Sequence, residues 1–287
     1  MLRACEFAAR LDFAMDPDLL AAVADVRKEL RKSAAPRVTE ELLDPLRRGW
    51  GAGTYRLWSE TGLLDVLLPE MDELVGVRAP ASSVKDVFWK MLADADERRA
   101  KGERLEDPVL LGMLFLPLVI AAVRGKGREG SRVDPTQILL VLENVVNPLA
   151  LRMSLPNLAV HTVKQGLYTM GRLAETRPED PGARRLVPKA YFGTAVALLS
   201  LYAKASGRYG AAAQAWQDVL ARAGDRETHR LPASAPFPEA LVPPPALLAR
   251  AEAVPSFPTS PAGPARHGKR RRRGGRRHAP HAAGAPA

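Results

Sequence analysis

The chain has 287 residues, 46% of them hydrophobic, and is long enough for two units with cores of their own and a tail. Its one cysteine, Cys5, excludes an intramolecular disulfide and a cysteine-cluster metal site, and is typical of a reducing cytoplasm, the localisation we expect. Eight of the 42 basic residues lie between Arg266 and Arg277; the other 34 face 32 acidic residues, so the net charge of +10 belongs mainly to the C-terminal end.

Apolar residues recur at helical spacing along most of the chain, and no convincing strand-like alternation is found, so the sequence predicts an all-α fold. Asp16 is an expected helix cap, and Gly49 and Gly102 are expected helix ends. A short apolar turn stopped by Pro69 is expected after the fourth helix. The expected helices cover residues 2–11, 16–32, 33–49, 52–62, 82–102, 107–123, 135–151, 155–176, 188–206 and 209–223.

The most apolar segment, residues 109–123, contains Pro117 and is shorter than the ~20 residues needed to cross a bilayer. Asp107 and Arg124 bound it on its two sides. We therefore expect a buried core helix here and no membrane partner.

From about Pro232 the chain is dense in Pro, Ala and Gly, a composition that predicts disorder except for one short helix at 245–253. The stretch "KRRRRGGRR" concentrates cations that can neutralise phosphates with little regard to base sequence. A solubilising tail with no particular partner is the alternative. The predicted RNA-binding residues are Lys269, Arg270, Arg271, Arg272, Arg273, Arg276 and Arg277.

The sequence contains no Gly-rich phosphate loop, and its histidines are not spaced as metal ligands. Asp16 and Asp18 stand at a helix start, where acids stabilise the helix dipole. Asp94 and Asp96 lie mid-helix, two residues apart, and therefore point away from each other. We predict no catalytic residue and no metal ligand in this chain. His161 is expected as an ordinary helix residue.

Four tryptophans could stack on RNA bases or pack in the core. Each lies within or beside an apolar helical pattern, which favours core packing for most of them. They are Trp50, Trp58, Trp89 and Trp216.

The segment "MLRACEFAARLDF", followed by "PRVTEELLDPLRRG" and "TGLLDVLLPEM", resembles the neck of bacterial poly(A) polymerases and of the related CCA-adding tRNA nucleotidyltransferases. Two later segments, "VFWKMLADADERRAKGERLEDPVLLGMLFLPLV" and "PKAYFGTAVALLSLYAKASGRYGAAAQAWQDVL", resemble the start and close of the RNA-binding body of poly(A) polymerases. An arginine-rich tail is also usual in that branch. The resemblance implies a helical neck at 1–76, a helical RNA-binding body at 77–230 and a disordered basic tail at 231–287.

In that family the complete enzyme adds AMP from ATP to RNA 3′ ends with Mg²⁺. The resemblance implies that the catalytic head lies upstream of Met1. This chain would then hold no cofactor and be inactive alone, with Mg²⁺ and ATP belonging to the complete enzyme. Single-stranded RNA 3′ ends and a separately encoded head are the implied partners. A truncation, a split gene and a mis-assigned start remain open, as do a stand-alone RNA-binding protein and a CCA-adding fragment.

Arg3 aligns with a neck arginine beside the family's nucleotide pocket, so the resemblance implies nucleotide binding. An ion pair on the first helix is the alternative, and we favour it for this chain. Glu6 stands where the family often has arginine. Arg37, Glu40 and Glu41 resemble charged residues that brace the neck helices, with Arg37 and Glu41 expected to face each other at i,i+4 spacing.

Overall fold

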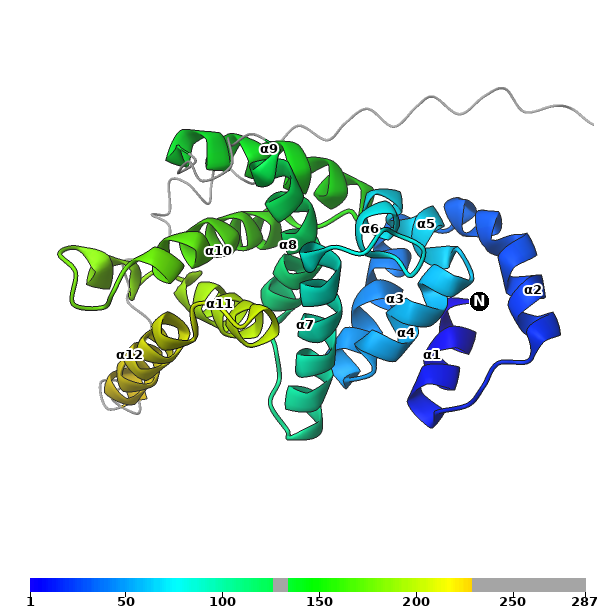
Figure 1. The fold of residues 1–287 in the computed structure, drawn as a ribbon, viewed down its shortest axis with the longest axis horizontal. Coiled ribbons are helices and arrows are strands. Elements are labelled where there is room, and N and C mark those ends of the chain that lie inside the picture. The colour runs from blue at the N-terminus through cyan, green and yellow to red at the C-terminus, as the bar shows by residue number, and fades with distance from the viewer. Residues whose placement is uncertain (126–133, 229–287) are drawn as a thin grey trace, which may run out of the picture. The chain divides into compact units, whose positions relative to one another are not determined.

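The structure is a computed structural model that describes residues 1–125 and 134–228, with side chains as far as residue 223. Every regular element in these ranges is a helix, which confirms the predicted all-α fold (Figure 1). The first half contains α1 (Leu2–Leu11), α2 (Pro17–Val26), the 3-10 helix η1 (Arg27–Lys32), α3 (Ala35–Arg48), α4 (Gly51–Glu60), α5 (Leu63–Leu67), α6 (Pro69–Val75) and α7 (Ser83–Ala100). The second half contains α8 (Asp107–Arg124), α9 (Pro135–Arg152), α10 (Asn157–Glu175), the 3-10 helix η2 (Ala183–Leu186), α11 (Phe192–Ser206) and α12 (Gly210–Thr228).

Several of the expected capping residues are found at helix ends. Asp16 caps α2, with its carboxylate accepting the Asp18 amide at 2.8 Å, and Ser82 caps α7 through the Lys85 amide. Gly49 follows α3 in the left-handed region at φ 91°, which a residue with a Cβ adopts at a cost.

The short helix α5 ends just before Pro69, as expected, and Pro69 also begins α6, because a proline in the first turn has no amide to leave unpaired. Two boundaries differ from the prediction. Residues 27–32 tighten into the 3-10 helix η1 rather than continuing α2. Residues 188–191 form turns before α11, with the Phe192 amide donating to the Lys189 carbonyl at 2.9 Å.

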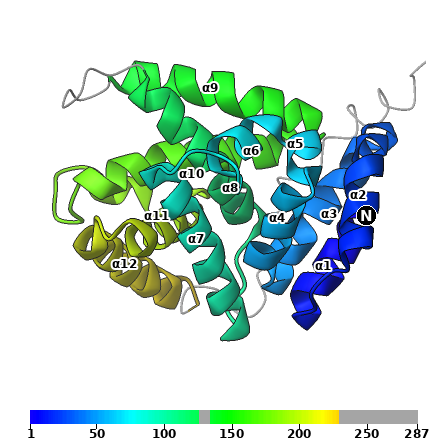
Figure 2. The same cartoon turned by 45° about the vertical axis from the view of Figure 1, so that its right-hand side comes forward.

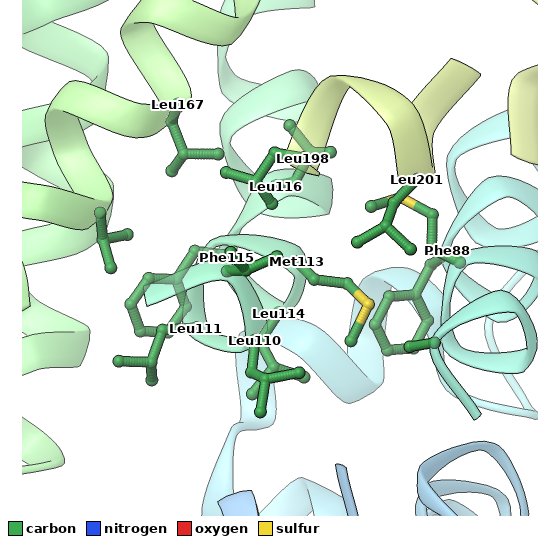
Figure 3. Packing of buried hydrophobic residues seen from close by; sticks show 14 of the residues in the cluster. Phe88, Leu110, Leu111, Met113, Leu114, Phe115, Leu116, Leu167, Leu198 and Leu201 are labelled. Carbon is green, nitrogen blue, oxygen red and sulfur yellow. The ribbon is translucent and has the colours of Figure 1, made fainter. Parts of the chain in front are cut away.

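Helix α8 lies at the centre of the core, in contact with α3, α6, α7, α9, α10 and α11 (Figures 1 and 2). Figure 3 shows Met113 of α8 pointing toward Phe88 of α7, and Leu116 of α8 pointing toward Leu198 of α11. At Gly112 a Cβ would lie 2.8 Å from the Leu198 side chain, so the glycine lets α11 approach closely.

In the part of the chain that the structure describes, α8 is the helix whose length and composition would allow a membrane span. More than half of it is buried against the other helices. The prediction of a buried core helix is therefore confirmed.

Residues of α1 to α6 and of α7 to α12 share one hydrophobic cluster. Met1–Pro232 accordingly forms a single compact unit, and the predicted division at residue 76 stays a prediction. The predicted tail at 231–287, with its short helix at 245–253, lies outside the described residues.

Candidate nucleic-acid interface

An open groove of about 490 Å³ lies where α1, η1 and α3 meet. Its floor and walls follow from the local sequence: Ser33 turns to an extended conformation (φ −79°, ψ 147°) and ends η1, and Pro36 sits in the first turn of α3. The groove is lined by Met1, Leu2, Arg3, Leu30, Ser33, Ala34, Arg37, Val38 and Glu41.

Arg3 and Glu41 form a forked ion pair inside this groove. Arg3 Nε lies 3.0 and 3.2 Å from the two carboxylate oxygens of Glu41, and Nη2 lies 2.9 Å from Oε1. This hydrogen bonding raises the pKa of Arg3 above its ordinary value. The pair joins α1 to α3.

The predicted pairing of Arg37 with Glu41 is wrong, because Glu41 turns to Arg3 instead. The planar guanidinium of Arg3 meets both carboxylate oxygens at once, which is a stronger geometry than an i,i+4 contact along one helix. Arg37 is exposed at the groove and has no ion-pair partner among residues 1–125 and 134–223. It is therefore a cation available to an anionic ligand.

Glu40 braces the fold through a residue that the sequence did not single out. Arg47 Nη1 lies 2.6 Å from Glu40, while Arg47 Nε and Nη2 lie 2.8 and 2.7 Å from the two oxygens of Asp107. These hydrogen bonds hold the pKa of Arg47 well above its ordinary value. The contact ties α3 to the first turn of the central helix α8.

A second cavity of about 250 Å³ lies on the other side of the η1–α3 junction and shares Leu30, Ser33 and Val38 with the groove. Arg31 and Arg152 line it. Arg152 pairs with Glu70 at 2.5 and 2.8 Å, whereas Arg31 is exposed with no carboxylate partner in the described ranges. The η1–α3 corner therefore carries two uncompensated arginines, Arg31 and Arg37.

Glu6 does not line the groove. It is only 9% exposed and accepts a hydrogen bond from Trp50 Nε1 at 3.3 Å, so it helps to pack α1 against the start of α4. Trp58 and Trp216 are fully buried, which confirms core packing for these two. Trp50 and Trp89 are only half-buried.

The carboxylates of Asp94 and Asp96 stabilise the fold through an ion pair and a helix cap. Asp94 is buried and pairs with Arg98 at 2.9 Å and with Lys204. Asp96 accepts the Gly51 and Ala52 amides at 2.8 Å each, which caps α4. No group of three possible metal-ligating side chains occurs within the described residues.

Two other predicted features are placed as follows. His161 is exposed on α10. The predicted RNA-binding cations, Lys269 to Arg277, lie outside the described residues.

Comparison with known proteins finds a recognised segment that contains six of the nine residues lining the groove. Residues 12–75, which include η1 and α3, match the family model described as "Probable RNA and SrmB- binding site of polymerase A". Residues 12–75 are thus similar to a segment described as an RNA-binding site of polymerase A, which agrees with the predicted resemblance.

Among individual proteins, the chain is similar to Poly(A) polymerase I of Escherichia coli O6:H1 and of Escherichia coli O157:H7. Each is 22% identical over 204 residues, covering 71% of this chain and 43% of the relative. The chain thus spans less than half the length of the curated relatives it matches.

Proposed function

We propose that this chain is the RNA-binding portion of a polynucleotide adenylyltransferase, which adds AMP from ATP to RNA 3′ ends. In this proposal the catalytic head lies outside these 287 residues, as a separate chain or a further part of a longer one. The observation that carries the proposal is the match of residues 12–75 to the polymerase RNA-binding family. The similarity to Poly(A) polymerase I covers 204 residues and so extends well beyond that segment.

The charges of the chain support RNA as the ligand. Arg31 and Arg37 are exposed and unpaired by carboxylates in the described residues, and both lie within the matched segment. The sequence adds seven cations at 269–277. Each phosphate that such side chains neutralise releases counterions, which makes binding strong at low salt and tolerant of base sequence.

Nucleotide chemistry belongs to the complete enzyme in this proposal. Mg²⁺ and ATP would be held largely by the head, since the carboxylates described above are committed to caps and ion pairs. Arg3 is the proposed nucleotide contact of this chain, and its guanidinium would have to exchange Glu41 for the ligand. We propose that the protein binds RNA in the cytoplasm.

A catalytic head also accounts for an apolar strip at the N-terminal end. Phe7, Leu11 and Phe13 are 51%, 50% and 66% exposed, which is unusual for side chains of this size. A head domain packed on α1 would cover them.

The proposal is tested by titrating a labelled single-stranded oligo(A) with the full chain and following fluorescence anisotropy at several salt concentrations. We expect binding at low salt that weakens steadily as salt rises. A chain that leaves the oligonucleotide free at low salt is not an RNA-binding portion of such an enzyme.

A further inference from the structure

Two arginine–tryptophan pairs lie along one exposed face of α4 and its flanks. Arg10 Cζ sits 5.2 Å from the centre of the Trp50 ring, and Arg56 Cζ sits 5.5 Å from the centre of the Trp89 ring. Both distances fall within the range of cation–π contacts. Neither pair lines the groove at the η1–α3 corner.

The two indoles are fixed in orientation by their own hydrogen bonds. Trp50 Nε1 donates to Glu6, and Trp89 Nε1 donates to the Val75 carbonyl at 2.9 Å. Each ring therefore presents a set face on which its arginine lies. Both indoles are half-buried, so they form a firm base under exposed guanidinium groups.

The spacing of residues on α4 aligns the pairs. Trp50, Gly53, Arg56 and Glu60 follow one another at intervals of three or four residues, which places them on one face of the helix. Gly53 is exposed and adds no side chain of its own between the pairs, and the small Ala9 of α1 lies against it, since a Cβ at Gly53 would lie 3.1 Å from Ala9 Cβ. Six residues separate Trp50 from Arg56, or about 9 Å along the helix.

The charge of this face is largely uncompensated. Arg10 and Arg56 are exposed and have no ion pair with a carboxylate in residues 1–125 and 134–223. At the far end of α4, exposed Arg78 donates to the Glu60 carbonyl at 3.0 Å and adds a third guanidinium. The side chain of Glu60 is an acid on the same face.

We propose that this face, named here the α4 strip and consisting of Arg10, Trp50, Arg56, Trp89 and Arg78, is a track for single-stranded RNA. Bases stack on the outer faces of the Arg10 and Arg56 guanidiniums, each backed by an indole, while the charges meet phosphates. Stacking of this kind suits bases that are free of a duplex and depends little on their identity. The track rests on the proposed function, because it takes the same ligand at a second surface of the domain.

The first experiment compares charge-matched variants of the full chain by oligo(A) titration. Arg10→Gln with Arg56→Gln removes both stacking planes, whereas Arg172→Gln with Arg185→Gln removes two exposed arginines of α10 and η2. We expect the strip variant to bind oligo(A) ~10-fold or more weakly, since stacking contributes strongly per base. We expect a much smaller loss for the control. Equal losses in the two variants would overturn the proposal.

A second variant separates stacking from charge and does not depend on the first. Arg10→Lys with Arg56→Lys keeps both cations but removes the planar group on which a base can stack. We expect weakened binding with an unchanged salt slope; binding equal to the unaltered chain would overturn the track. Ultraviolet crosslinking of oligo(A) should label peptides that contain Arg10 and Arg56, the residues on which the bases stack, and labelling confined to other peptides would also overturn it.

The outcomes distinguish this proposal from the proposed function. If the unaltered chain binds no oligo(A) at all, both fail. If it binds and the strip variants match their control, the track fails and the RNA-binding portion stands.

Discussion

Asp96 and Arg99, three residues apart on α7, hold the two sides of the turn between α3 and α4. Asp96 accepts the first two amides of α4, while Arg99 Nε donates to the Arg47 carbonyl in the last turn of α3 at 3.0 Å. Gly49 fits between them, since a Cβ there would come within 2.9 Å of the Arg99 side chain. One helix of the predicted body thus caps two helices of the predicted neck.

This arrangement predicts that Asp96→Ala destabilises the whole unit. Two amides at the start of α4 would lose their acceptor, which costs about 1–2 kcal/mol of unfolding free energy. Urea unfolding followed by helical circular dichroism measures the loss, with Glu73→Ala as the control because Glu73 is exposed on α6. A loss no greater than that of the control would contradict the capping role.

The contribution of the Asp96 carboxylate to folding stability changes with pH in a definite direction. Burial raises the pKa of Asp96 above its ordinary 3.8, so the folded state binds its proton more tightly than the unfolded state. Its contribution to stability is full below pH 3.8 and is lost as pH rises through the raised value. The difference between the unaltered chain and Asp96→Ala should therefore be larger near pH 4 than at pH 7.

The Arg3–Glu41 contact predicts a selective energetic coupling. A double-mutant cycle on Arg3→Gln and Glu41→Gln should show a favourable interaction, because the two side chains share a forked pair. The parallel cycle on Arg37→Gln and Glu41→Gln should show none of comparable size. Free energies of unfolding in urea give both values. A larger coupling for Arg37 would restore the i,i+4 pairing.

The position of α8 predicts a severe core mutant. Leu114 has no exposed surface, so Leu114→Ala should cost about 2–5 kcal/mol through lost burial and a cavity. Leu151→Ala, at a residue that is 82% exposed, is the matched control. Equal denaturation midpoints for the two variants would mean that Leu114 does not face a packed core.

We predict that the chain has no adenylyltransferase activity by itself, because its acidic residues Asp94 and Asp96 are engaged in structural contacts. With Asp94 and Asp96 held in an ion pair and a cap, the purified chain should not extend an RNA primer with ATP and Mg²⁺. Gel analysis of a labelled primer checks this, with a complete poly(A) polymerase as the positive control. Adenylate addition by the purified chain would show that an active site lies within it.

The sequence predicted the helices well because their signals are local. The Asp16–Pro17 start of α2 and the glycine after α3 depend only on neighbouring residues. The end of α5 before Pro69 was predicted, but the start of α6 at the same residue was not, because a proline can both end one helix and begin another.

The site was harder to predict because its contacts join distant parts of the chain. Arg3 meets Glu41 across 38 residues, and Asp96 meets Gly51 across 45. No spacing rule finds such pairs. The i,i+4 rule suggested Arg37 as the partner of Glu41 because it considers one helix alone. The Arg10–Trp50 pair likewise exists only because α1 packs on α4.

The most direct test of the central claim measures RNA affinity against salt for the full chain and for a chain that ends at Arg250. The account predicts that the full chain binds single-stranded RNA and that the shortened one binds much more weakly. If the tail makes about six phosphate contacts, its removal should lower the log–log salt slope by ~4, at ~0.7 per contact. Equal affinities and equal slopes would contradict the role of the Lys269 to Arg277 tail, and absence of RNA binding by both chains would contradict the account as a whole.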